Sequence, residues 1–163
     1  MKRLLLALMV LLCLCSCTKK EIKPILTEIS FTGELTYFNE IYVFDGEILK
    51  DGTLKATIKE PEELEELKLT VTEKGMRADY KGLTYEANEA TMPFSRIVQE
   101  FYTPLNMLIG QESLTANKNG EISGKAGETD YLLTLSPTGL PQKLELETRH
   151  ITVRFYNISI KEE

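Results

Sequence analysis

The chain has 163 residues, 42% of them hydrophobic, which is enough for one domain with a sizeable core. Its 25 acidic residues outnumber its 19 basic residues, so the net charge is −6. The basic residues form no cluster, and the composition therefore argues against a nucleic acid or an anionic lipid headgroup as a partner.

The amino terminus has the pattern of a secretory signal. Two basic residues precede an apolar run over 4–15, which is shorter than the roughly 20 apolar residues that cross a bilayer. The run ends in the letters LCSC, residues 14–17, which resemble a bacterial lipobox: an aliphatic residue, a small residue, and then the cysteine that is lipidated. Cys13 and Cys15 follow leucine, so only Cys17 has the small residue before it.

We therefore expect three segments: a lipoprotein signal peptide over 1–16 that is removed, a lipidated tether over 17–27, and one domain over 28–163. Cleavage would leave 17 basic and 25 acidic residues, because Lys2 and Arg3 are lost from the 19, and the mature charge would be −8. Two long acyl chains, palmitate among them, hold a protein on a membrane almost permanently. The expected location is the extracytoplasmic face of the cell membrane, or the outer membrane if the source has one.

A zinc or redox site is the alternative use of the three cysteines. Zinc sites combine a CxxC pair with a second pair or with histidines. The spacing here is CxCxC inside an apolar segment, and the only histidine is His150. We expect no metal and no cofactor.

Alternation of apolar and polar residues, typical of half-buried strands, dominates the chain from residue 28 onward. The pattern is clear in SFTGELTYF, TLKATIK, LKLTVTE, YLLTLS and QKLELET, which start at residues 30, 53, 67, 131 and 142. The last segment, ITVRFYNISI, changes parity near Asn157, and this change predicts a β-bulge.

Short turns separate these segments. Asp51-Gly52, Lys74-Gly75 and Asn119-Gly120 suit hairpin loops, Asp45-Gly46 predicts a turn or a bulge, and SPTGLP over 136–141 is a further connection. The count is about ten strands. Short loops between so many strands predict a mainly β fold, an antiparallel sheet with one polar and one apolar face.

Two stretches have helical character. Residues 61–68, PEELEELK, begin with proline and acids, which favours a short helix. Residues 93–110 carry apolar residues at positions 94, 97, 98 and 101, a stripe of helical period that continues beyond Pro104. Pro104 is expected to kink or split this helix. A strongly curved sheet with this helix over its apolar face is the predicted architecture.

No catalytic motif stands out. His150 has no serine in a nucleophile-elbow context as a partner and is expected to be an exposed turn residue. GEISGKA over 120–126 has three residues between its glycines, where a P-loop has four. A pair of acids of the glycosidase kind stays open, because any two carboxylates can meet in space. The expectation is a protein that is not an enzyme.

Two stretches resemble the LolA-like lipoprotein carriers and their relatives, such as LolB. They are LTYEANEATMPFSRIVQEF over 83–101 and YLLTLSPTGLPQKLELE with ITVRFYNISI over 131–160. The resemblance implies an unclosed β-barrel with one or two helices as a lid and acyl chains in an apolar hollow between them. The chain departs from the family in lacking a long N-terminal helix, and it has no arginine between Arg3 and Arg77 to latch the lid.

The leading expectation is a membrane-anchored lipoprotein that binds a lipid or another apolar ligand in this hollow. The alternative is an envelope or sporulation-related interaction protein, whose hollow is filled by its own side chains and whose partner is another envelope protein. The residues expected to line the hollow and the lid are Phe31, Leu35, Leu69, Val71, Phe94, Ile97, Phe101, Leu105, Leu133, Leu135, Leu144 and Leu146.

Overall fold

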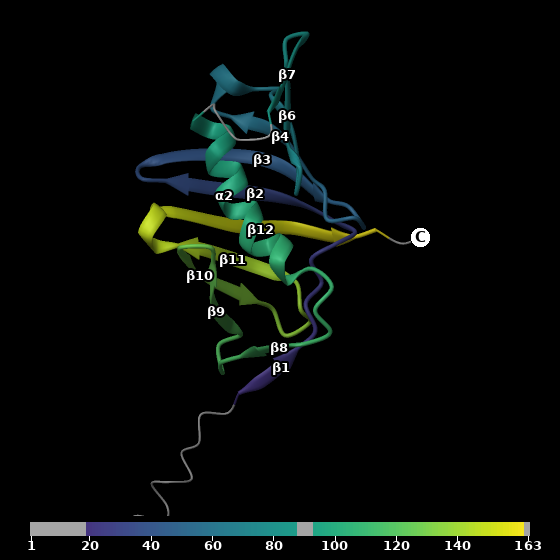
Figure 1. The fold of residues 1–163 in the computed structure, drawn as a ribbon, viewed down its shortest axis with the longest axis vertical. Helices are drawn as coiled ribbons and strands as arrows, with labels where there is room; N and C mark the ends of the chain where they lie inside the picture. The colour runs from purple at the N-terminus through teal and green to yellow at the C-terminus, as the bar shows by residue number, and fades with distance from the viewer. Residues whose placement is uncertain (1–18, 88–92, 162–163) are drawn as a thin grey trace, which may run out of the picture.

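A computed structural model describes residues 19–87 and 93–161 (Figure 1). In this part of the chain twelve strands form two sheets, and one α-helix, α2 (Pro93–Leu108), lies across the larger sheet. The strands are β1 (Lys20–Ile22), β2 (Ile29–Tyr37), β3 (Glu40–Ile48), β4 (Leu54–Glu60), β5 (Lys68–Thr72), β6 (Gly75–Tyr80), β7 (Leu83–Ala87), β8 (Leu114–Ala116), β9 (Glu121–Ala126), β10 (Thr129–Leu135), β11 (Pro141–Leu146) and β12 (Ile151–Ile160).

The larger sheet has ten strands in the order β7-β6-β5-β4-β3-β2-β12-β11-β10-β9. Every neighbouring pair is antiparallel, and the last strand, β12, lies between β2 and β11 in the middle of the sheet. The order begins at β7 and ends at β9, so the sheet is not closed into a barrel. The predicted fold class, a mainly β antiparallel sheet of about ten strands with a helix, is confirmed.

The two faces of this sheet differ as the alternation predicts. The helix α2 covers one face of the sheet (Figure 1). Leu35, Leu133 and Leu144 share one face by register, and each is fully buried. Their neighbours Thr36 and Glu145 point to the other side and are partly exposed. We call the covered side the inner face and the opposite side the outer face.

Two glycines on the inner face make room for phenylalanine rings. Gly33 in β2 lies opposite Phe44 in β3, and Phe31 lies opposite Gly46 in the same strand pair. A Cβ atom on Gly33 would lie 2.2 Å from the Phe44 ring, and one on Gly46 would lie 2.4 Å from the Phe31 ring. The two rings meet edge to face with centroids 6.0 Å apart. The interpretation of Asp45-Gly46 as a turn or bulge was wrong, because the ring packing places both residues inside β3.

Most of the stretch predicted to be a tether, 17–27, is part of the fold. β1 pairs with β8 in the two-stranded sheet, Ile22 and Leu26 are buried in the core, and the Ile25 amide donates to the Gly139 carbonyl at 2.8 Å. Residues 20–27 therefore belong to the folded domain. Their polar, proline-containing composition concealed a pairing with a strand that lies about ninety residues further along the chain.

The helical predictions were right for one segment and wrong for the other. α2 runs without interruption through Pro104, so the prediction that this proline splits the helix was wrong. Burial of the apolar side stabilises the helix more than one missing N–H destabilises it. The expected helix over 61–68 is a single 3-10 turn, Glu62–Leu64, after which β5 begins at Lys68. This segment is rich in exposed glutamates and has too few apolar residues to bury a helical face.

The connections follow the turn predictions closely. Gly52, Gly75 and Gly120 all have positive φ and lie between or at the ends of strands. In β12 the pairing with β2 shifts between Tyr156 and Ser159, and Asn157 has a φ of 49°, which confirms the predicted bulge. No helix among the described residues is long and apolar enough to span a membrane.

Candidate functional site

The residues predicted to line an apolar hollow lie between the inner face and α2. Of its twelve predicted residues, eleven have described side chains, and each of these is at most 6% exposed. The side chain of Phe94 and the lipidation candidate Cys17 lie outside the described residues. The structure thus brings the eleven residues together in one cluster, as the alternation in the strands and the apolar stripe of the helix predicted.

The cluster is tightly filled. Phe101, at the centre of α2, is 0% exposed, and its ring centroid lies 6.0 Å from that of Phe44 on the sheet. Leu69, Val71 and Leu105 are also at or below 1% exposed. A side chain with no accessible surface has no space for even a water molecule beside it, so these residues contact other protein atoms on all sides.

Polar contacts connect α2 to the sheet region on both sides of the helix. Asn106 donates from Nδ2 to the Glu73 carboxylate at 2.9 Å, and the Tyr102 hydroxyl donates to Asn106 at 3.1 Å. Burial raises the pKa of Tyr102, and the nearby carboxylate of Glu73 raises it further, which keeps this donor protonated. On the other flank Arg149 lies 3.9 Å from Glu100 of the helix.

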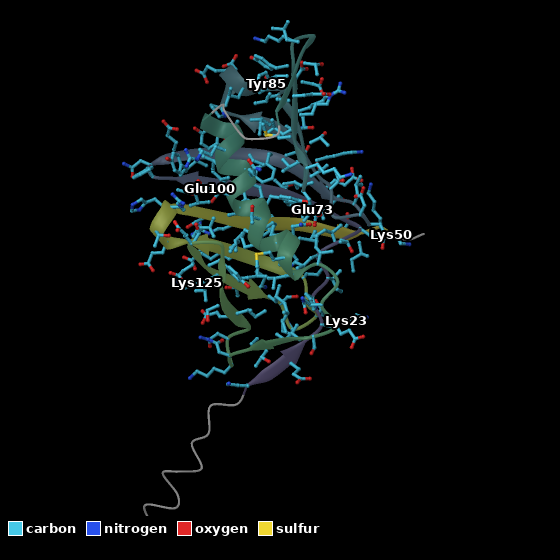
Figure 2. All side chains as sticks on the ribbon, in the orientation of Figure 1. Lys23, Lys50, Glu73, Tyr85, Glu100 and Lys125 are labelled. Carbon is cyan, nitrogen blue, oxygen red and sulfur yellow. The ribbon has the colours of Figure 1, made fainter. Side chains whose placement is uncertain are left out.

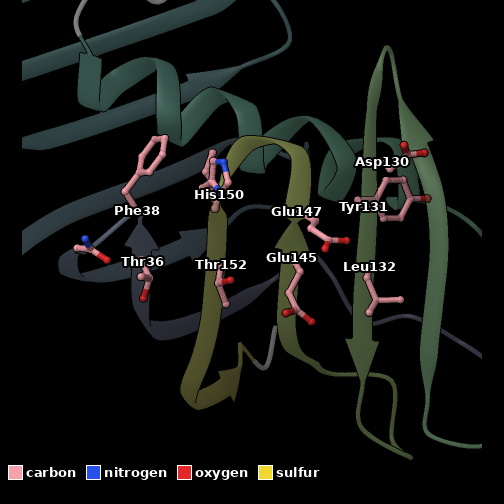
Figure 3. Close-up of a pocket in the computed structure, with 11 residues that line it drawn as sticks. Thr36, Phe38, Asp130, Tyr131, Leu132, Glu145, Glu147, His150 and Thr152 are labelled. Carbon is pink, nitrogen blue, oxygen red and sulfur yellow. The ribbon is translucent and has the colours of Figure 1, made fainter.

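A second feature is a depression of about 760 Å³ near the β2–β3 and β11–β12 hairpins (Figure 3). Its floor is a row of outer-face side chains from four adjacent strands, which the sheet register places opposite one another. The lining residues are Thr36, Phe38, Asn39, Asp130, Tyr131, Leu132, Glu145, Glu147, His150, Ile151 and Thr152.

Phe38 and His150 form an aromatic wall of this depression. Their ring centroids are 4.6 Å apart, and the Phe38 amide donates to the His150 carbonyl at 3.1 Å. Phe38 is 59% exposed, and both residues have left-handed backbone conformations, with φ of 52° and 54°. Such a conformation is costly for a bulky residue, and backbone strain of this kind clusters at functional sites. The expectation that His150 is an exposed turn residue is confirmed.

The polar groups of the depression are acidic or neutral. Asp130, Glu145 and Glu147 line it, and no lysine or arginine does. Asp130 pairs with Lys125 at 3.2 Å and Glu145 with Lys143 at 2.7 Å at its margin. Carboxylates, hydroxyls and an exposed ring can contact a partner with mixed apolar and polar surface. No cluster of three or more metal-binding side chains occurs among the described residues.

Sequence reasoning did not find this depression. Its residues come from both faces of the sheet and from two hairpins, so no single periodicity connects them. One local signal in the sequence was Phe38. It directly follows β2, whose apolar residues already form the inner face, so this aromatic side chain is not needed for the core.

Comparison of the chain with protein-family models found no match, and comparison with curated proteins found none either. The resemblance to the LolA-like carriers therefore stays a prediction from the residues quoted above.

Proposed function

We propose that the protein is a membrane-anchored extracytoplasmic lipoprotein whose β domain binds another protein rather than carrying lipid. The anchor rests on the sequence context of Cys17. The choice between the two functions rests on one observation, the complete burial of Phe101 and its neighbours between α2 and the sheet.

The energetic cost of opening the hollow supports this choice. Ile97, Val98, Phe101, Leu105 and Leu108 all lie on the buried side of α2. Exposing one such side chain costs roughly 1.5–3 kcal/mol, so exposing five costs about 7–15 kcal/mol. This is as large as the free energy of unfolding of a typical domain, about 5–15 kcal/mol. This cost applies to opening the cluster before an acyl chain enters it, and the filled cluster lacks the pre-formed space that pockets for apolar ligands usually have.

The depression beside Phe38 and His150 is the surface that this proposal assigns to the partner. An exposed aromatic residue surrounded by polar groups is the usual centre of a protein interface. A photoreactive phenylalanine analogue at position 38 is expected to cross-link one protein in intact cells of the host. The same analogue at Tyr156, which is 44% exposed on the outer face, is the matched control and should not give that product.

The lipid-binding proposal, motivated by the resemblance, makes the opposite prediction for the hollow. Native mass spectrometry of the protein purified from its host would detect co-purified lipid, and a fluorescent fatty acid would bind saturably. We expect neither. Phe101→Ala should lower the free energy of unfolding by about 3–5 kcal/mol, as for a packed core phenylalanine. Saturable probe binding that Phe101→Ala removes, with the fold intact, would overturn the interaction proposal.

The anchor has a separate test. Cys17→Ala should leave the precursor uncleaved and should abolish incorporation of radiolabelled palmitate, because the acylated sulfur is missing. Cys15→Ala is the matched control and should leave both unchanged. Palmitate in the Cys17→Ala protein would refute the assignment of Cys17.

A further inference from the structure

β7 forms one edge of the ten-stranded sheet. It pairs with β6 and stands at the end of the strand order. Leu83 and Tyr85 point to the inner face, where they are 76% and 40% exposed, whereas Met76 and Ala78 of β6 are buried on the same face. A strand edge with exposed apolar side chains is a template for pairing with another chain.

The β6–β7 hairpin determines which backbone groups of β7 point outward. Its two-residue loop, Lys81-Gly82, has positive φ at both positions, 49° and 81°, as in a type I′ turn. The closing pair of such a turn, Tyr80 and Leu83, is a hydrogen-bonded pair, and such pairs alternate along an antiparallel ladder. Leu83 and Tyr85 therefore direct their backbone groups toward β6. Thr84 and Glu86 direct theirs to the opposite side of β7, where no other strand of the described residues pairs with it.

We propose that the edge of β7 binds a second copy of this chain, antiparallel, with Thr84 opposite Glu86 of the second copy. This register uses both outward residues of each strand and forms two hydrogen-bonded pairs, each with two N–H···O bonds. The two Tyr85 residues then face each other in the pair between them, where side chains are closest.

The two other registers that join outward residues are less favourable. One places Glu86 opposite Glu86, and like charges directly opposite are destabilising. The other places Thr84 opposite Thr84 and leaves Glu86 opposite Gly82, which lies in the turn, so one hydrogen-bonded pair is lost. The proposed register is therefore the only one of the three with two pairs and no opposed carboxylates.

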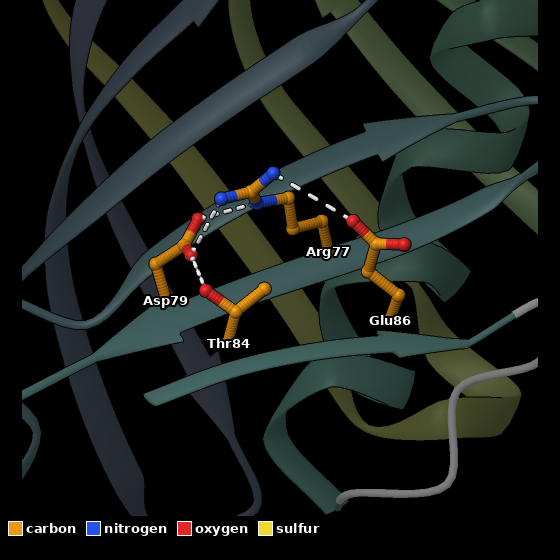
Figure 4. A network of polar contacts seen from close by, with 4 residues as sticks. All are labelled: Arg77, Asp79, Thr84 and Glu86. Atoms are coloured by element: carbon orange, nitrogen blue, oxygen red, sulfur yellow. Dashed lines mark hydrogen bonds and ion pairs between the residues drawn. The ribbon is translucent and has the colours of Figure 1, made fainter. Parts of the chain in front are cut away.

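The outer face of the hairpin is already ordered for this contact (Figure 4). Thr84 donates to Asp79 at 2.5 Å, Arg77 donates to Asp79 at 2.8 and 2.9 Å, and Arg77 lies 3.6 Å from Glu86. The arginine partly neutralises Glu86, which reduces the charge brought to the contact. Tyr85 lies at the end of the molecule opposite Lys23 and β1 (Figure 2).

Cysteine cross-linking tests the register in the full-length protein in its own membrane. Tyr85→Cys should form a disulfide dimer under mild oxidation, because facing residues in that pair have Cα atoms about 4.5 Å apart. A mixture of Thr84→Cys and Glu86→Cys proteins should also cross-link. Thr84→Cys alone should form a disulfide at least tenfold more slowly. In the proposed register the two copies of residue 84 are diagonal neighbours, about 7–8 Å apart. The unsubstituted chain is the control for bridges formed by Cys13, Cys15 or Cys17.

A charge at the contact gives an independent check. Tyr85→Lys should abolish cross-linking in the Thr84→Cys and Glu86→Cys mixture, because two lysines would then oppose each other. Tyr156→Lys, on a central strand, should leave it unchanged. Absence of a dimer, equal rates in all cysteine variants, or fastest cross-linking of Thr84→Cys alone would overturn the proposal. Photo-cross-linking at position 38 reports separately on the partner proposed for the depression and does not depend on this result.

Discussion

Replacement of Gly33 by alanine tests the ring packing that joins β2 and β3. The new Cβ would lie 2.2 Å from Cζ of Phe44, whereas ordinary contacts begin near 3.4 Å. The ring must therefore move by at least 3.4 − 2.2 = 1.2 Å. It has no free space for this movement, because Phe44 is 1% exposed and its centroid lies 6.0 Å from those of both Phe31 and Phe101.

The expected net effect follows from two opposing contributions. Overpacking of this kind costs about 1–3 kcal/mol. The backbone at Gly33 is not left-handed, so alanine also removes freedom from the unfolded chain and returns about 0.4–1 kcal/mol. In the middle of these two ranges the free energy of unfolding falls by about 1–2 kcal/mol, which is the expected result. For a domain of this size the melting temperature should fall by about 2–8 °C.

Urea denaturation followed by circular dichroism measures this change, and an unchanged m-value would show that unfolding exposes the same amount of surface in both proteins. Phe44→Leu shortens the side chain and removes the ring atoms nearest Gly33. Gly33→Ala should therefore cost much less in the Phe44→Leu protein than in the wild type. Unchanged or increased stability of Gly33→Ala, or an equal cost in both backgrounds, would refute the reasoning.

Three further measurements test the faces and the charges of the sheet. Leu146→Ala should lower the free energy of unfolding by about 2–5 kcal/mol, because Leu146 is fully buried. Glu145→Ala, on the outer face, should change it little. Equal effects of the two substitutions would mean that the strand register is wrong. The hydrogen bonds from Arg77 lower the pKa of Asp79 to about 2, so its contribution to stability is present above about pH 4 and is lost toward pH 2. Arg77→Leu should raise that pKa toward 3.8 in a carboxyl NMR titration. Burial raises the pKa of Tyr42 to about 12. Tyr42 therefore contributes to the stability of the folded state below about pH 10, and this contribution is lost between about pH 10 and 12. In an ultraviolet titration of the folded protein, Tyr42 should ionise after the exposed tyrosines.

Local periodicity was sufficient for the sheet and for α2. Leu133, Leu135, Leu144 and Leu146 alternate with polar residues, and all four lie on the inner face. In an antiparallel meander each strand pairs mainly with its neighbours in sequence, so the pattern within a strand and the turns between strands carry most of the fold.

Non-local contacts decided what the sequence did not reveal. Ile22 becomes a strand residue because β8 pairs with it, and Gly46 becomes a strand residue because Phe31 packs over it. The depression likewise depends on how Phe38 and His150 meet, more than a hundred residues apart in the chain. These contacts join residues far apart in the chain, so the periodicity of apolar residues within a short stretch of sequence cannot reveal them.

The pairing of β1 with β8 has a consequence for the position of the domain relative to the membrane. With Cys17 anchored as proposed, only three peptide units separate the lipid from Lys20, the first residue of β1. Three residues span at most about 10 Å, whatever their conformation, whereas the ten residues to position 27 would span up to about 36 Å. The β1 end of the domain would thus stay within one headgroup layer of the bilayer surface, and the long axis of the sheet would place β7 farthest from it (Figure 1). A partner of this protein would then have to lie against the same membrane or extend to the height of the domain above it.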